Sequence, residues 1–182
     1  MLNSMNNFVW PTHFACTQIT NQTVFPNSYS LSICIEPIST KSNVNLGFKK
    51  LRYFVENHLH NSVFIYENSP IVDSILQLEN SKVLFPVEPF DFSVASVLFC
   101  KIISITSKYF DIDYLTLDSV TGDHVQYTLS DPADAGLDLD GNNWWNTDSP
   151  CTDNTSVISW EELNLKNHSS FSPIVIKGGL DK

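Results

Sequence analysis

A chain of 182 residues has the usual length of one domain and can bury a core without disulfides or metals. Its 42% hydrophobic, 12% aromatic and 16% charged residues are typical of a folded globular protein and exclude a disordered chain. The formal net charge of −10 disfavours direct nucleic-acid binding, which needs clustered lysine and arginine.

The first residues show no clean periodicity. Trp10-Pro11 and Phe25-Pro26 interrupt the pattern, so residues 1–29 are predicted to form an irregular N-terminal arm. This arm lacks the basic region and the continuous apolar run of a secretory signal, and no stretch of the chain reaches 18 consecutive apolar residues. We therefore expect a soluble cytoplasmic protein that makes no membrane contact.

Strand and helix signals follow. Leu31, Ile33 and Ile35 alternate with smaller side chains, which predicts a strand that ends at Pro37. Residues 45–60 have helical spacing of apolar side chains and predict the first main helix. Residues 62–66 and 82–85 indicate short strands. Residues 67–80 between them are ambiguous, and Pro70 could open a short helix through Leu76 and Leu78.

The second main helix is predicted over residues 91–107, with Asp91 as its N-cap. Its side chains are apolar nearly all round, which indicates a central, buried helix. Phe110, Ile112 and Tyr114 then alternate with polar residues, and residues 120–123 and 125–129 complete an antiparallel hairpin. Asp111 and Asp113 are expected on its solvated face.

A long acidic loop over residues 130–158 comes next, followed by a capping box at Ser159 and Glu162, a last strand over residues 173–176 and a frayed tail at residues 178–182. These elements predict a single α+β domain, residues 1–182. We expect a mainly antiparallel sheet of about 5–6 strands, packed by the two main helices.

The acidic loop is the first candidate for a binding site. It holds two adjacent tryptophans, Trp144 and Trp145, beside the carboxylates Asp138, Asp140 and Asp148. Tryptophan is enriched at binding hot spots, so the pair could anchor a partner or ligand. The alternative is that the two side chains hold the loop against the domain.

Asp134, Asp138 and Asp140 are candidate metal ligands, because Ca²⁺ prefers carboxylate oxygens. The sequence around Gly141 partly resembles an EF-hand loop, but Thr147 occupies the position at which a bidentate glutamate is required. A solvated acidic loop without a metal is the alternative, and no cofactor is otherwise expected.

Two further groups of residues could carry chemistry. His58 and His60 are two residues apart, a spacing that does not share one helix face, which argues against a metal pair. Cys151 is the cysteine expected to be most exposed, and Asp123 with His124 could supply an acid and a base. The surrounding acids would raise the pKa of a thiol there and weaken it as a nucleophile.

Charge is divided unevenly along the chain. Residues 1–110 hold seven acids and seven bases, whereas residues 111–182 hold thirteen acids and three lysines and so carry all ten net negative charges. We expect a non-enzymatic binding protein that contacts a basic protein surface or self-associates. An enzyme or ligand binder with a pocket between sheet and helices, and a cation-stabilised module, are the alternatives. The single arginine against nine lysines, with abundant Asn, Ile, Phe and Ser, suggests an AT-rich gene, as in a low-GC bacterium, a phage or another mobile element.

Overall fold

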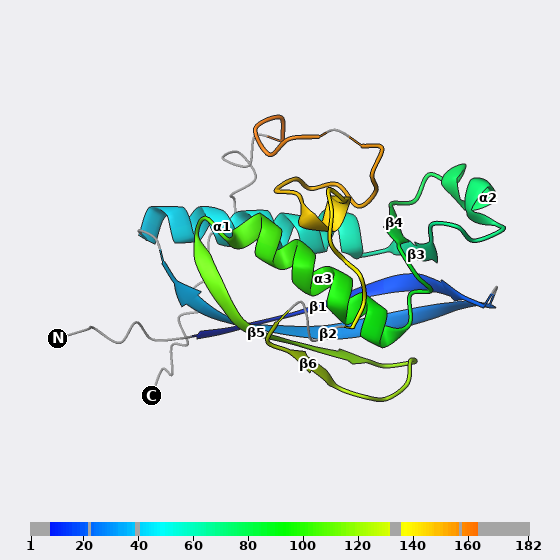
Figure 1. The fold of residues 1–182 in the computed structure, drawn as a ribbon, viewed down its shortest axis with the longest axis horizontal. Coiled ribbons are helices and arrows are strands. Elements are labelled where there is room, and N and C mark those ends of the chain that lie inside the picture. Colours follow the sequence, from blue (N-terminus) through cyan, green and yellow to red (C-terminus); the bar gives the residue numbers. More distant parts are fainter. Residues whose placement is uncertain (1–7, 22, 39–40, 132–135, 157, 164–182) are drawn as a thin grey trace, which may run out of the picture.

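The fold is a six-stranded mixed sheet with two main helices on one of its faces (Figure 1). The computed structural model describes residues 8–21, 23–38, 41–131, 136–156 and 158–163. The strand order is β4-β3-β1-β2-β5-β6, and three of the five pairings are antiparallel. The α+β class with a mainly antiparallel sheet is therefore confirmed, with parallel pairing confined to β1–β3 and β3–β4.

The elements lie close to their predicted positions from residue 41 onward. Their bounds are α1 Lys41–Phe54, which continues as the π-helical turn η1 Val55–Leu59, β3 Ser62–Tyr66, α2 Val72–Leu76, β4 Lys82–Phe85, α3 Asp91–Thr106, β5 Phe110–Ser119, β6 Tyr127–Leu129 and the 3₁₀ turn η3 Trp144–Asn146. The predicted last strand and the frayed tail lie outside the described residues. None of the described helices is long and apolar enough to cross a membrane.

The prediction of an irregular N-terminal arm was wrong. Residues Phe8–Thr20 form β1 and residues Thr23–Pro37 form β2, and the two strands pair as a hairpin along the whole length of β1. Both prolines are tolerated because each lies where its strand has one neighbour. Pro11 precedes the Cys16–Gln18 segment that pairs with β3, and Pro26 precedes the Tyr29–Pro37 segment that pairs with β5.

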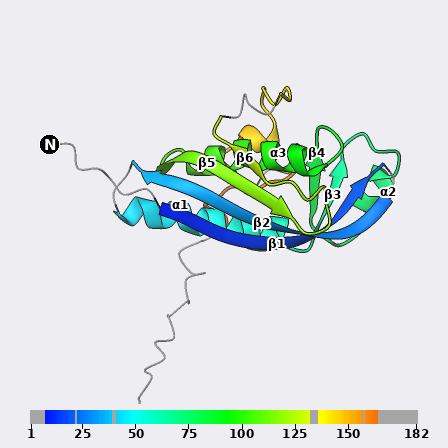
Figure 2. The ribbon, with the colours of Figure 1, turned by 90° about the horizontal axis from the view of Figure 1, so that it is seen from below.

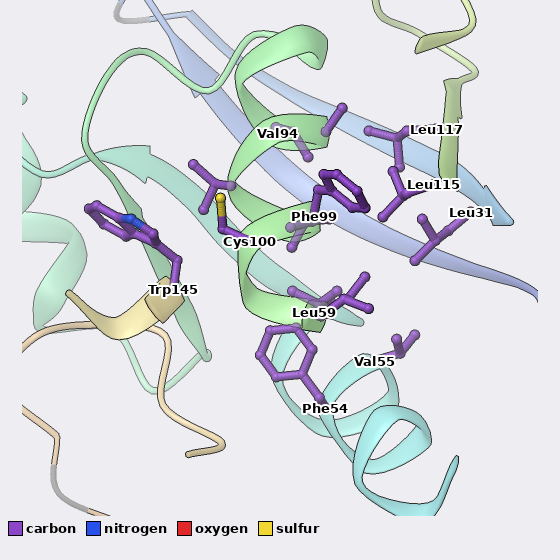
Figure 3. Packing of buried hydrophobic residues seen from close by; sticks show 14 of the residues in the cluster. Leu31, Phe54, Val55, Leu59, Val94, Phe99, Cys100, Leu115, Leu117 and Trp145 are labelled. Atoms are coloured by element: carbon purple, nitrogen blue, oxygen red, sulfur yellow. The ribbon is translucent and has the colours of Figure 1, made fainter. Parts of the chain in front are cut away.

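The core lies between the sheet and the helices, with α3 at its centre. Figure 3 shows Leu31, Leu115 and Leu117 of the sheet on one side of Phe99 and Cys100, and Trp145 of the loop on the other side. Phe54, Val55 and Leu59 of α1 and η1 complete the cluster, and all of these side chains are buried. As predicted, α3 is buried around nearly its whole circumference.

Asp91 does not act as the predicted N-cap. Phe90 occupies the N-cap position, and the Asp91 carboxylate is buried instead against Tyr29 Oη (2.7 Å) and Ser119 Oγ (2.5 Å). It also accepts the backbone N–H of Asp123 at 2.9 Å. Burial and the neighbouring carboxylate raise the pKa of Tyr29 far above its ordinary value, so the phenol keeps its proton. This network joins the start of α3 to β2 and to the turn after β5.

Gly122 is needed for this network to close. A Cβ atom at position 122 would overlap the Asp91 carboxylate and the Ser119 hydroxyl. We therefore expect Gly122→Ala to lower the free energy of unfolding by about 2–3 kcal/mol in urea denaturation, as for other overpacked sites. Gly136→Ala is the control, because Gly136 has open space around it and only its positive φ of 60° opposes a side chain. That substitution should cost about 1 kcal/mol, and an equal loss for both would contradict the role given to Gly122.

Candidate functional site

The candidate site is the face of the sheet that the helices do not cover. Figure 2 shows β1, β2 and β5 in front of α1 and α3, seen from this side. Side chains on a strand alternate between faces, and Leu31, Ile33 and Leu117 point into the core. Their neighbours Ser30, Ser32 and Asp118 therefore lie on the other face. We call the solvent-facing side of β1, β2, β5 and β6 the open face.

Four carboxylates lie on the open face. Glu36 of β2 is directly opposite Asp111 of β5, and Asp118 is opposite Ser30. Asp113 joins them because a bulge between Cys34 and Ile35 shifts the register, and its Oδ2 lies 3.8 Å from Cys34 Sγ. All four acids are exposed. The strands β1, β2, β5 and β6 contain no lysine and no arginine, so the sign of charge on this face is uniform.

These carboxylates have almost no partners among the residues that the structure describes. Within the described part of the chain, Glu36, Asp111 and Asp118 make no side-chain hydrogen bond or ion pair, and Asp113 has only the weak contact with Cys34. Like charges directly opposite each other on neighbouring strands, such as Glu36 and Asp111, are destabilising by a few tenths of a kcal/mol to about 1 kcal/mol. The open face therefore presents a negative field to solvent at a small cost in stability.

A hollow of about 710 Å³ lies on the open face, at the end of β2 that is remote from Glu36 and Asp111. Ala15, Thr17, Pro26 and Ser28 of the β1–β2 hairpin line it with side chains of that face, and Cys16 and Asn27 form its floor. Asn61, Asn80, Val120 and Thr121 complete its rim. The lining holds no charged residue. Burial, followed by the nearby Asp91, raises the pKa of Cys16 to about 12, so its thiol is a poor nucleophile.

The floor of the hollow is held by buried hydrogen bonds. Asn27 Nδ2 donates to Gln18 Oε1 (2.8 Å), and Asn27 Oδ1 accepts the backbone N–H of Thr121 (3.1 Å). Gln18 in turn donates to the carbonyl of Pro89 and lies 2.9 Å from Tyr29 Oη. These bonds connect the hollow to the Asp91 network and fix the turn at residues 120–123 against β2. The hollow is therefore preformed.

The two tryptophans of the acidic loop lie inside the protein. Trp144 and Trp145 are 2% and 3% exposed, and their rings pack edge to face at 5.6 Å. Trp144 Nε1 donates to Leu84 O (2.8 Å) and Trp145 Nε1 donates to Leu139 O (2.9 Å). In this arrangement the side chains hold the loop against α3 and β4, and neither can contact a partner unless the loop opens.

Lys101 ties the same loop to α3. Its ammonium group is fully buried and donates to the carbonyls of Trp144 (2.6 Å) and Thr147 (3.0 Å). Burial lowers the pKa of Lys101 to about 7, although Cys151 and Asp148 act in the opposite direction. A perturbed lysine can mark a catalytic site. Here Lys101 does not line the hollow and has no exposed surface, so its role is to satisfy loop carbonyls.

Asp148 is a second internal anchor of the loop. It accepts Lys50 Nζ (2.9 Å), Lys108 Nζ (3.0 Å) and Trp160 Nε1 (2.8 Å). Burial alone would raise the pKa of Asp148, but hydrogen bonds from the two lysines hold it below its ordinary value. The Lys50 ammonium also lies 5.0 Å from the Trp160 ring centre. This carboxylate is therefore already neutralised within the fold.

The other predicted site residues are not assembled into a centre. Asp138 and Asp140 are exposed, and Asp134 lies outside the described residues. No group of three His, Cys, Asp or Glu side chains within the described ranges could hold a metal ion. Asp111 and Asp113, which were expected on the solvated face of the hairpin, are exposed and point away from the helices.

The predicted cysteine and histidine groups also stay apart. Cys151 is buried, contrary to prediction, with its Sγ 3.8 Å from Ile158 O, whereas His124 is exposed in the hairpin turn. Asp123 accepts hydrogen bonds from Tyr127 Oη and Val125 N. His60 Nδ1 accepts the backbone N–H of Ala15 at 3.3 Å. Burial, with Lys101 nearby, lowers the pKa of His58, whose Nε2 has no hydrogen-bond partner within the described residues.

Sequence reasoning missed the hollow and the role of Lys101, although signals for both are present. Ser28, Ser30 and Ser32 alternate with Tyr29, Leu31 and Ile33, which is the pattern of a strand with one solvated face. Lys101 is the single basic residue in an otherwise apolar helix. A charge in such a position indicates a specific buried partner.

No known protein family matches the chain, and no protein of curated function is detectably similar to it in sequence. The open face and the carboxylates that the described fold leaves without partners are therefore the features that bear on function.

The pKa of Lys101 predicts how stability depends on pH. Because the folded-state pKa of about 7 lies below the ordinary 10.5, the unfolded chain binds more protons between these values, and the free energy of unfolding rises with pH. We expect the contribution of Lys101 between pH 7 and 8, where unfolded thiols are still mostly protonated, to approach 1.4 kcal/mol per pH unit. Urea denaturation of Lys101→Met should show a flatter profile in that interval. Parallel profiles for the two proteins would contradict the assignment.

Removing the Asp148 charge should loosen the loop. Asp148→Asn leaves the nearly buried Lys50 without its carboxylate, so we expect the free energy of unfolding to fall by about 2 kcal/mol. Asp138→Asn makes the same chemical change at an exposed site of the same loop and should change it by less than about 0.5 kcal/mol. Thermal or urea unfolding measures both, and similar losses would show that Asp148 is not an anchor.

Proposed function

We propose that this protein is a non-enzymatic binding protein whose open face contacts a basic surface of a partner protein. The observation that carries the proposal is the set of four exposed carboxylates, Glu36, Asp111, Asp113 and Asp118, on strands without a lysine or arginine. Single-sign surfaces steer oppositely charged partners and raise association rates. Each of these acids is free to meet a cation of the partner.

The distribution of internal contacts supports the open face over the acidic loop. The loop uses Asp148 to neutralise two lysines, and Asp153 accepts the backbone N–H groups of Thr155 and Ser156. Trp144 and Trp145 are buried. The open face, in contrast, combines unpaired carboxylates with the hollow, so its groups are available without any rearrangement of the fold.

The chemistry of the accessible groups supports binding rather than catalysis. The hollow is lined by amides, hydroxyls and small apolar side chains. Of the titratable groups with strongly perturbed pKa values, Tyr29 and Lys101 are buried away from it. Cys16 lies at its floor, but burial keeps that thiol protonated and unreactive. A negative face also repels the phosphates of nucleic acids and of anionic lipid surfaces. A basic protein is the partner that this chemistry fits best.

Self-association through two open faces is the weaker alternative, because it would bring like charges together. The proposal includes a cytoplasmic location, which the four free cysteines support, since such thiols persist in reducing compartments. It also includes an origin in a phage or another mobile element, for which the AT-rich amino-acid usage is the supporting observation.

The proposal is tested with two variants of equal charge. The face variant is Glu36→Gln/Asp111→Asn/Asp113→Asn, and the control variant is Asp138→Asn/Asp140→Asn/Glu161→Gln, which removes three exposed acids outside the open face. Partners captured from cells that contain the native protein are purified, and their Kd values for the wild type and both variants are measured by calorimetry. We expect the face variant to bind a basic partner at least about tenfold more weakly.

The control variant should bind within about threefold of the wild type, because exposed charges away from an interface contribute little. Two results would overturn the proposal. One is equal weakening by both variants, which would indicate only a general charge effect. The other is a captured partner with no basic surface and unchanged affinity for the face variant.

A further inference from the structure

The hollow and Asp118 lie close together on the open face. Val120 N donates to Ser28 O at 2.9 Å, so the end of β5 is fixed beside the hollow. Asp118 precedes Val120 by two residues and pairs with Ser30, which puts its carboxylate on the same face about 7 Å along the strand. The acid is exposed and makes no hydrogen bond or ion pair with another described residue. Asp118 therefore lies just beyond the rim residue Val120 on the same face, as an anion without a partner among the described residues.

The lining of the hollow suits a particular kind of side chain. Ala15, Pro26 and Val120 provide apolar walls, and Val120 is 65% exposed. The side chains of Thr17, Ser28, Asn61 and Asn80 make no hydrogen bonds within the described part of the protein, so their oxygens are free acceptors. An apolar wall with several acceptors and one carboxylate matches a side chain that has an apolar stem and many donors.

We propose that the hollow and Asp118 together form a subsite for one arginine side chain of the basic partner. This inference rests on the proposed function and adds the identity of a recognised group. Arginine presents five N–H donors in a planar fork, keeps its charge at all relevant pH values and lays its stem along apolar surfaces. Lysine offers three donors from one atom and would leave more of the acceptors unused.

The subsite is preorganised by the interior of the protein. Asn27 holds the turn at Thr121 through two contacts with its Oδ1, from Thr121 N (3.1 Å) and Thr121 Oγ1 (2.7 Å). Gln18 and the Asp91 network hold Asn27 from below. Binding therefore needs little ordering of the floor and the Thr121 side of the rim, which lowers the entropy lost on association.

A second copy of the chain is the competing occupant, because Arg52 is the one arginine of the sequence and is exposed on α1. Such a contact would join different surfaces of the two copies and lead to rings or open chains. The acidic residues that follow residue 110 would also repel one another in an assembly of like chains. We therefore assign the arginine to a different protein.

The test is a titration of the ¹⁵N-labelled full chain, followed by NMR, with N-acetyl-arginine amide as the probe. N-acetyl-citrulline amide, which has a similar shape without charge, and N-acetyl-lysine amide are the comparison probes. We expect saturable shifts at Ser28, Val120 and Thr121 and at the side-chain amides of Asn61 and Asn80 with arginine. Lysine should bind more weakly, and citrulline should give no saturable shifts.

Asp118→Asn should weaken arginine binding at least about fivefold, because the charge-assisted hydrogen bonds are lost. The matched control Asp138→Asn, an exposed acid outside the open face, should leave binding unchanged, and unchanged spectra elsewhere verify the fold of both variants. Three results would overturn the inference: no saturation at the hollow, equal binding of arginine and citrulline, or unchanged affinity in Asp118→Asn. Assembly of the protein alone that Arg52→Gln abolishes would also overturn it, in favour of a second copy.

These outcomes are separable from the proposed function. If arginine fails to bind in the hollow while the Glu36, Asp111 and Asp113 variant still weakens a basic partner, the open face remains the interface and only the subsite is wrong. If the arginine probe binds but the Glu36, Asp111 and Asp113 variant weakens the binding of no basic partner, the hollow is a site for an arginine-bearing ligand. The proposal that the carboxylates form a larger interface is then wrong.

Discussion

Helix α3 is buried around nearly its whole circumference, and this constraint determines what the rest of the chain has to do. The sheet and α1 cover part of it, and the segment with Trp144 and Trp145 covers the remainder. A segment without regular secondary structure can lie over an apolar helix only if its backbone polar groups find partners. Lys101 and Ser104 of α3 supply donors to the carbonyls of Trp144, Thr147 and Trp145. The acidic loop is thereby part of the core.

The use of the loop as a cover leaves the second face of the sheet free, apart from the end near α2. There Ile19, Val63 and Ile65 pack against Ile71, Val72 and Ile75 in a small separate cluster. Over β2 and β5 most of the corresponding positions hold serines, threonines and carboxylates, with Cys34 and Tyr114 as a less polar pair among them. The two faces of one sheet are thus specialised, the first for packing and the second for contact with solvent or a partner.

Sequence reasoning found the elements that have a strong local period and missed those that depend on their neighbours. The hairpin of β5 and β6 and the helix α3 were predicted nearly to the residue, because alternation and an all-round apolar surface are local signals. β1 and the first part of β2 were missed because Pro11 and Pro26 suggest breaks. Only the pairing of the strands shows that each proline lies where its strand has one neighbour. The sequence left two roles open for Trp144 and Trp145, and their burial against α3 agrees with the one in which they hold the loop against the domain.

The same limit applies to the site. The sequence shows that the acids are concentrated after residue 110, but it does not show which of them the fold neutralises. Asp148, Asp123, Asp111 and Asp118 are all aspartates of this acidic part of the chain. Asp148 and Asp123 accept internal hydrogen bonds, whereas Asp111 and Asp118 accept none within the described residues. Solubility requires only a net charge, wherever it lies. It does not require that Glu36 face Asp111 across paired strands, or that a preformed, uncharged hollow share that face with Asp118. The combination is better explained by a cationic partner, which would remove the repulsion and fill the hollow in one contact.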